Sequence, residues 1–196
     1  MARTTDLNRF EEPPAATWAF ASTGIAPVIW LIARLWLGYE WLSSGWGKVN
    51  SDAWMRGGDA LAGFATGAIE GGTQGEHPQV AYGWYVNFLE WIRDSAHTWM
   101  APTVAVGEVV IGIALILGAF TGIAAFLGVV LNFSFIFAGT AGVNPAFLIV
   151  GLLLMLAWRN AGWYGLDRWL LPMLGTPWRR AQPARSSPGD RPAVDA

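Results

Sequence analysis

Several polar side chains lie inside long apolar stretches of the sequence, where a membrane would surround them: Arg34, Glu40, Glu108, Asn132 and Arg159. Charged groups in hydrocarbon are costly, by about 2.5 kcal/mol or more each on insertion scales, and they usually face a bundle interior or a cavity. In such a place an arginine can hydrogen-bond a carbonyl or an oxyanion, and a carboxylate can pass a proton. The sequence therefore predicts a buried polar site, with Arg34 and Glu108 as its candidate catalytic residues.

The depth of these groups follows from the helical rise of about 1.5 Å per residue. Glu40 and Glu108 fall about 10 Å below the outer edge of the membrane, and Arg34 lies deeper, so its long side chain could bridge towards Glu108. Arg34, Trp41 and Lys48 share one helix face at seven-residue steps. Two interpretations of Arg34 with Glu108 stay open: a polar cavity in the bundle, or a structural ion pair that fixes helix register.

The other polar residues also have simpler interpretations. Arg159 is expected to be an interface anchor whose long side chain extends to water. Glu40 points away from Arg34, since six residues turn a helix by about 240°, and it either reaches water from the outer leaflet or lies inside the bundle. Asn132 is expected to hydrogen-bond between helices, and it is also a candidate for binding a ligand.

The composition is that of a membrane protein. Of 196 residues, 54% are hydrophobic and only 13% are charged, whereas soluble proteins average about 25% charged residues. The chain has no cysteine, and both histidines, His77 and His97, lie outside the apolar spans. These absences exclude disulfides, a thiolate nucleophile, Cys-ligated iron–sulfur clusters, Cys-rich zinc sites and a haem held by two histidines inside the bundle. No metal is expected, and any electrons would travel on a bound small molecule or a partner subunit.

The apolar stretches predict an all-α integral membrane protein with four transmembrane helices in one bundle. The spans are expected at about residues 27–47, 101–120, 122–139 and 145–163, within a membrane domain of residues 27–172. The net charge of −2 argues against nucleic acid as a partner. No small-residue cleavage site follows a short apolar core, so we expect no cleavable signal peptide.

The segments between and around the spans set the predicted topology. Residues 1–26 are expected to be a cytoplasmic tail, and residues 173–196, rich in Pro, Ser and Arg, to be disordered. Residues 48–100 form a less apolar insert between the first two spans, and its second helix, about 78–99, is expected to lie in the membrane interface. Arginines flank both ends of the membrane domain, whereas the turns between spans two, three and four carry no charge. The positive-inside rule then places both termini in the cytoplasm, the insert outside the cell and the protein in the cell membrane.

The spacing of glycines and charges resembles the DoxX family. The first span has the pattern R-x-x-x-G-x-x-x-x-x-x-G-x-x-K, and the second has E-x-x-x-G-x-x-x-x-x-G closely followed by a Thr-Gly turn at residues 121–122. The segment AGWYGLDRWLL resembles the end of the family's fourth helix, and the resemblance extends over most of residues 27–172. The long insert and the NPAF of Asn144–Phe147 are more similar to the DoxD-like branch, the small subunit of thiosulfate–quinone oxidoreductase. The residues that carry these motifs are Arg34, Gly38, Gly45, Lys48, Glu108, Gly112, Gly118, Gly165 and Asp167.

This resemblance implies a membrane subunit of a redox complex that feeds electrons to the quinone pool. We expect a quinone as the cofactor, bound within the bundle by Arg34, Trp41, Lys48 and Asn132. Arg34 would hydrogen-bond a carbonyl, Glu108 would hold Arg34 and pass a proton, and Trp41 would pack on the ring. The reaction of the DoxD-like branch would add a sulfur oxyanion as substrate and would need cations at the outer face, where Lys48, Arg56 and Arg93 are candidates.

A second hypothesis belongs to another class of function. The chain would be a non-catalytic membrane anchor or scaffold for a partner oxidoreductase, and its buried charges would be purely structural. A transporter is a third possibility, although no inverted repeat is visible and four spans are few for one. The partners expected from the sequence are the lipid bilayer and either a second oxidoreductase subunit or further copies of this chain.

Overall fold

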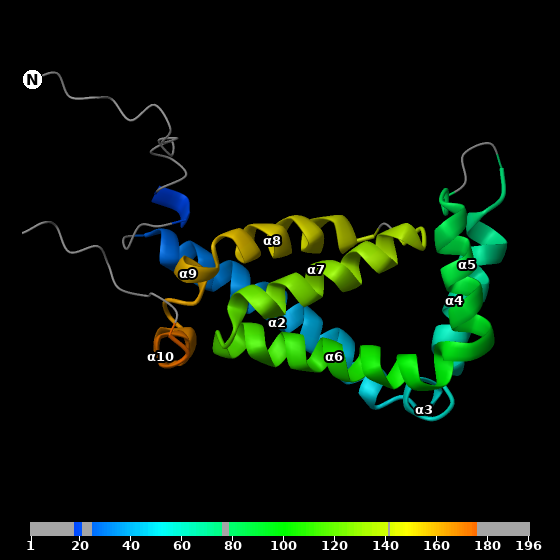
Figure 1. Ribbon diagram of the computed structural model, residues 1–196, viewed down its shortest axis with the longest axis horizontal. Helices are drawn as coiled ribbons and strands as arrows, with labels where there is room; N and C mark the ends of the chain where they lie inside the picture. The colour runs from blue at the N-terminus through cyan, green and yellow to red at the C-terminus, as the bar shows by residue number, and fades with distance from the viewer. Residues whose placement is uncertain (1–17, 21–24, 76–78, 141, 176–196) are drawn as a thin grey trace, which may run out of the picture.

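The computed structural model describes residues 18–20, 25–75, 79–140 and 142–175, and in these ranges it contains helices and no strand (Figure 1). The predicted all-α class is therefore confirmed. Both predicted tails fall mostly outside the described residues, as does His77.

Four helices run along one another and form the body of the molecule (Figure 1). They are α2 (Ala26–Val49), α6 (His97–Leu117), α7 (Thr121–Phe137) and α8 (Asn144–Leu156), and each overlaps a predicted span. The fourth span was expected to reach about residue 163, whereas α8 ends at Leu156. Within the described residues, one continuous helical run, Gly83–Leu117, is long and apolar enough to cross a membrane by length and composition, while α7 and α8 are shorter apolar helices. That all four cross the membrane stays a prediction.

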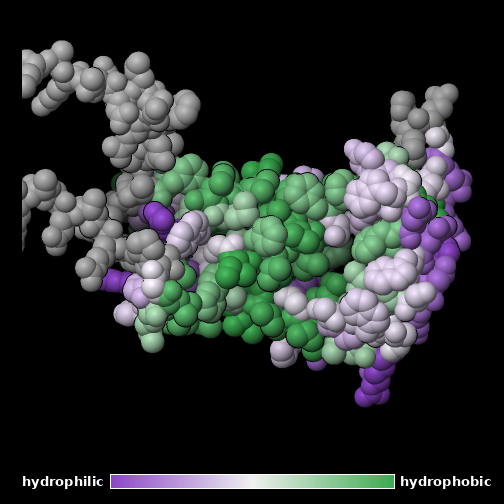
Figure 2. Space-filling model, in the orientation of Figure 1, coloured by the Kyte–Doolittle hydropathy of each residue, from purple (hydrophilic) through white to green (hydrophobic). Residues whose placement is uncertain are grey.

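The sides of this body are apolar. Figure 2 shows hydrophobic residues over the middle of the molecule and hydrophilic ones gathered mainly towards the end that carries α4 and α5. Large apolar side chains on α6 and α7 point outward, among them Val110, Leu117, Ile123 and Leu127. Water disfavours such a continuous apolar exterior, and a membrane favours it.

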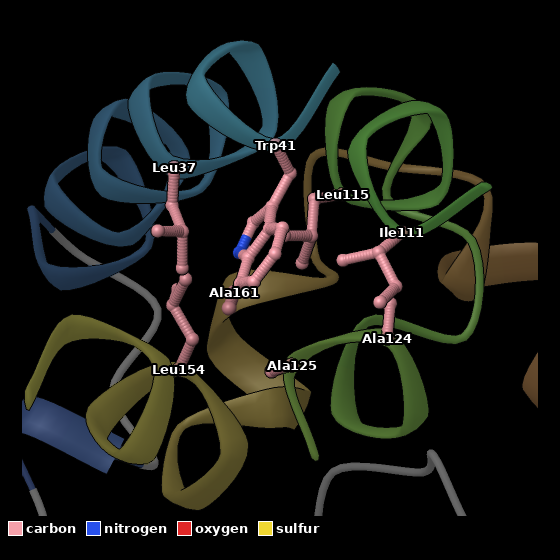
Figure 3. Close-up of a cluster of buried hydrophobic side chains, with 8 residues drawn as sticks. All are labelled: Leu37, Trp41, Ile111, Leu115, Ala124, Ala125, Leu154 and Ala161. Carbon is pink, nitrogen blue, oxygen red and sulfur yellow. The ribbon is translucent and has the colours of Figure 1, made fainter. Parts of the chain in front are cut away.

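The core of the bundle is made of side chains from all of its helices. Leu37 and Trp41 of α2 meet Ile111 and Leu115 of α6, and Leu154 of α8 lies against them (Figure 3). Small residues fill the remaining positions of this core, so the helices approach closely. They are Ala124, Ala125 and Ala161.

Glycines set how closely α2 and α6 pack. A Cβ atom at Gly112 would lie 2.5 Å from the backbone nitrogen of Leu42, and one at Gly45 would lie 2.6 Å from that of Val109. Neither position can accept a side chain unless the two backbones separate. The contacts also fix the register of the antiparallel pair, because they place Gly45 opposite Glu108 and Leu42 opposite Gly112.

Replacing Gly112 by alanine is expected to lower the free energy of unfolding by about 1–3 kcal/mol, because the added methyl group overpacks the α2–α6 contact. Gly107→Ala is the matched control, since nothing lies within 4 Å of a Cβ atom there and alanine favours a helix over glycine. Thermal unfolding of the two variants in the same detergent checks the difference. Equal losses in both would contradict the packing of α2 against α6.

A helical cap covers one end of the bundle. It consists of α3 (Asp52–Met55), α4 (Asp59–Gly72) and α5 (Gly83–Trp91), and Figure 1 shows α4 and α5 standing across the direction of α6. The cap has its own apolar core, in which Leu61 and Ala65 of α4 meet Leu89 of α5.

The predicted insert helix is continuous with the second long helix. From α5 the chain passes through a π-helical segment, η1 (Ile92–Ala96), directly into α6, which begins at His97. The predicted second span begins near residue 101, so the observed helix starts earlier. The extra residue that a π-helical turn accommodates lets the helix change direction without leaving backbone groups unpaired.

The opposite end of the bundle is closed by two short helices. After α8 the chain forms α9 (Trp158–Ala161), turns at residues 162–166 and forms α10 (Asp167–Met173). The backbone nitrogens of Leu166 and Asp167 donate to the carbonyls of Leu117 and Gly118, at 3.1 and 2.8 Å. This segment therefore binds directly to the turn that joins α6 and α7.

Candidate functional site

A buried ion pair joins α2 to α6 near the capped end of the bundle. The Lys48 ammonium lies 2.5 Å from Oε2 of Glu108, and the glutamate side chain is fully buried. Lys48 also donates to Oγ of Ser44 at 2.7 Å and lies 5.2 Å from the centre of the Trp54 ring. The Lys48 side chain is 18% exposed, so it connects the buried carboxylate to the solvent-accessible surface near the cap.

The predicted pairing of Arg34 with Glu108 is wrong. Arg34 is buried at the other end of α2, where it donates to the main-chain carbonyls of Ala161 at 2.8 Å and Tyr164 at 3.1 Å. The register explains the error: Gly38 faces Ile116, so Arg34 lies level with Gly118, roughly 15 Å along α6 from Glu108. Lys48, and not Arg34, is the cation at the depth of Glu108.

Arg34 belongs to a cluster that closes the uncapped end of the bundle. Asp167 is fully buried and accepts hydrogen bonds from the backbone nitrogens of Phe120 at 2.5 Å and Thr121 at 2.8 Å. Its charge also attracts the Arg34 guanidinium. Gly118 and Gly165 face each other here, and a Cβ atom on Gly165 would lie 2.5 Å from Nη1 of Arg34. These contacts hold the α6–α7 turn, α9 and α2 together.

From the sequence, Asp167 is identified only as part of a family motif, and its place near Arg34 is not predicted. One signal was present in the sequence. Asp167 is the single acid in residues 144–175, in a segment that otherwise carries only arginine charges. Its buried partners could not be found, because they lie 46 and 47 residues away in the chain.

Three buried polar atoms at the level of Glu108 have no hydrogen-bond partner among the described residues. They are Oε1 of Glu108, Nε1 of Trp41 and Oδ1 of Asn132. Buried polar groups in folded proteins are nearly always paired with protein, with water or with a ligand, so such atoms together require an explanation. Others of this kind lie elsewhere in the bundle, on Arg34 and Thr121 at the uncapped end and on His97 under the cap.

The register of the helices brings these three groups to within about one helical turn of the same depth. A Cβ atom at Gly128 of α7 would lie 3.1 Å from Nε1 of Trp41, and Asn132 follows Gly128 by one helical turn. Trp41 neighbours Leu42, which faces Gly112, one turn from Glu108. Figure 3 shows the Trp41 ring directed from α2 into the space between the helices. Four of the predicted site residues, Lys48 included, therefore lie around one level of the bundle.

This arrangement can bind a small polar group in an otherwise apolar interior. Trp41 supplies an N–H donor, and Glu108 and Asn132 supply acceptors. Lys48 supplies a positive charge that stabilises the carboxylate or a developing oxyanion. No three metal-binding side chains come together within the ranges that the structure describes.

Two further charged residues of the apolar stretches, Glu40 and Arg159, do not belong to the group around Glu108. Glu40 is half-buried on α2, beside the exposed Tyr39. Arg159 is exposed in α9, and its guanidinium lies 5.1 Å from the centre of the Trp158 ring. An exposed arginine stacked on a tryptophan fits the expected interface anchor.

Comparison with known proteins gives one match. The family model described as DoxX matches residues 29–141, which run from α2 through the cap to the end of α7. Both Lys48 and Glu108 lie inside the matched region, whereas Asp167 lies beyond it. No curated protein and no solved structure matches the chain.

Proposed function

Because the chain belongs to the DoxX family, we propose that it is an integral membrane subunit of a redox complex that binds a quinone between α2, α6 and α7. In this proposal α2, α6, α7 and α8 cross the membrane, and both termini lie in the cytoplasm. The cap lies on the outer side. The apolar exterior of the bundle supports the crossing. The turn at residues 118–121 carries no charge, so the positive-inside pattern on the cytoplasmic side depends on the arginines of α9 and α10.

The observation that carries the proposal is the buried Lys48–Glu108 pair with its unpartnered oxygen, which lies within about one helical turn of the depth of the unpartnered Trp41 and Asn132 atoms. A quinone has two carbonyl acceptors, and its reduced form has two hydroxyl donors. Trp41 and Lys48 can donate to the carbonyls, while Glu108 Oε1 and Asn132 Oδ1 can accept from the hydroxyls. When bound, the quinone would supply the two-electron chemistry that no side chain of this protein offers.

The roles of the chain's own residues follow from their positions. Glu108 would hold or release a proton at Oε1, and Lys48 would stabilise its charged form. Trp41 and Asn132 would orient the ring and its oxygens. Arg34 was expected to contact a quinone carbonyl, but its two main-chain hydrogen bonds favour a structural role at the other end of the bundle. The proposal therefore assigns the cationic contact to Lys48.

Quinone retention by the purified full chain tests this assignment. The chain is reconstituted in vesicles that contain a lipid quinone and re-purified, and the bound quinone is extracted and counted per protein. Glu108→Gln is expected to weaken retention about tenfold, because it removes a charged acceptor from the site. Glu40→Gln, which neutralises the half-buried acid on another face of α2, is the matched control and should retain quinone like the wild type.

Equal retention by Glu108→Gln and the wild type, or no bound quinone in either, would refute the quinone site. If the protein binds no quinone at this site but still assembles into an active complex with its partner, the hypothesis of a non-catalytic anchor or scaffold is favoured.

A narrower version of the proposal makes thiosulfate the electron donor, on the resemblance to the DoxD-like branch. The outer cations expected to bind a sulfur oxyanion each already lie near a carboxylate. Lys48 pairs with Glu108 at 2.5 Å, Arg56 with Asp52 at 3.4 Å, and Arg93 with Asp94 at 2.7 Å. Thiosulfate would have to displace one of these acids. Thiosulfate-dependent quinone reduction in the same vesicles, supplied with the partner subunits, is the deciding measurement.

A further inference from the structure

A groove of about 370 Å³ lies at the uncapped end of the bundle, between the end of α6 and the segment that enters α10. Leu117 and Leu166 give it an apolar lining, and Trp163, Tyr164 and Trp169 give it an aromatic one. Arg168 is the single charged residue that lines it. The groove is separate from the level of Lys48 and Glu108, and neither the proposed function nor the DoxX match accounts for it.

The positive charge of Arg168 is not compensated within the described part of the chain. Its guanidinium lies 5.1 Å from the centre of the Trp163 ring, which holds the side chain at the groove, but it forms no ion pair with any described residue. The adjacent Asp167 cannot serve as a partner, because its carboxylate is buried and accepts from Phe120 and Thr121. An exposed arginine on an aromatic ring, with its neighbouring acid turned inward, favours an anionic ligand.

The surroundings of Arg168 are those of a membrane interface. Trp169 is 62% exposed, and the apolar Met173 and Leu174 that follow are 82% and 66% exposed. Exposed tryptophan and tyrosine beside aliphatic side chains are typical of the headgroup level of a bilayer. A soluble anion would contact only the guanidinium, whereas a lipid would also cover the leucine and tryptophan side chains.

From this combination we propose that the groove binds an anionic phospholipid, with the lipid phosphate on Arg168 and an acyl chain along Leu117 and Leu166. Basic sites at the cytoplasmic ends of transmembrane helices attract anionic headgroups in this way. The lipid would cover the segment whose backbone bonds hold the α6–α7 turn. The proposal is independent of the quinone site, since none of the groove residues lies at the level of Glu108.

Native mass spectrometry of the detergent-purified full chain tests this site. The chain is incubated with phosphatidylglycerol or with phosphatidylcholine of identical acyl chains, and the lipid retained per protein is counted. We expect retention of phosphatidylglycerol over phosphatidylcholine, and a loss of about fivefold in Arg168→Gln. Arg159→Gln is the matched control, because Arg159 is also exposed and stacked on a tryptophan but does not line the groove.

Three results would overturn the proposal. The first is that Arg168→Gln, shown by circular dichroism and thermal unfolding to be folded like the wild type, retains as much phosphatidylglycerol. The second is equal retention of the two lipids. The third is complete displacement of phosphatidylglycerol by millimolar glycerol phosphate, which would make the groove a site for soluble phosphate and not for lipid.

Discussion

Asp167→Ala is expected to lower the free energy of unfolding by about 2–4 kcal/mol. The change leaves two buried backbone N–H groups, those of Phe120 and Thr121, without the carboxylate that accepts from them, and each unsatisfied buried donor costs about 1–3 kcal/mol. It also removes the negative charge that faces Arg34. Thermal or denaturant unfolding in detergent measures the loss.

Two further variants make this result specific. Asp167→Asn keeps one acceptor oxygen of similar shape, so it should fall between the wild type and alanine. Arg168→Gln changes the neighbouring but exposed residue and should alter stability by no more than about 0.5 kcal/mol. If Asp167→Ala were as stable as Arg168→Gln, the carboxylate would not be what holds the α6–α7 turn.

Lys48→Met is expected to be comparably damaging, by about 3–5 kcal/mol, because it leaves the fully buried Glu108 carboxylate without its cation. The double variant Lys48→Met with Glu108→Leu should regain most of that stability, since replacing both members of a buried pair by apolar residues is often neutral. Quinone retention should not return with it. Unfolding and retention are therefore measured on the same three proteins, the single variant, the double variant and the wild type.

The exposed Arg56–Asp52 pair in the cap is the control for the Lys48 and Glu108 variants. Arg56 and Asp52 have side chains that are 81% and 80% exposed, and Arg56→Met should cost at most about 1 kcal/mol. A double variant at Lys48 and Glu108 that retains quinone like the wild type would show that the pair only fixes the helices. That outcome would refute the quinone site proposed at this pair, because the retained quinone would have to bind elsewhere.

The long helices could be predicted from the sequence because their signal is local. Runs of apolar residues mark α2, α6, α7 and α8, and most of the predicted ends lie within a few residues of the observed ones. The rise per residue also predicts a similar depth for Glu40 and Glu108. Both inferences need only the rise per residue and the direction of each helix.

The partners of the buried charges could not be predicted, because they depend on the register between helices. Arg34 and Lys48 lie on the same face of α2 at a separation of two heptads, so either could have met Glu108. The contact of Gly45 with Glu108 and Val109 sets the register in which Lys48, and not Arg34, reaches Glu108. This contact depends on the close approach of two backbones, and the sequence shows only that glycines permit it.

The turn between α6 and α7 differs from its prediction for a related reason. A Thr-Gly turn at residues 121–122 was expected, but Thr121 and Gly122 already belong to α7. The reversal instead uses Gly118 at φ 65° and Phe120 at φ 50°. Glycine adopts this left-handed conformation freely, whereas phenylalanine does so only where surrounding contacts impose it. Those contacts come from Asp167, which no local pattern connects to residue 120.

The distance along the chain between Phe120 and Asp167 has a consequence for biosynthesis. When α6 and α7 leave the ribosome, the carboxylate that accepts from the Phe120 and Thr121 nitrogens has not yet been made. The hairpin therefore forms with its turn incomplete, and the turn gains its carboxylate partner only after α8, α9 and the start of α10 have followed. The start of α10 thus completes a turn that was synthesised 46 and 47 residues earlier.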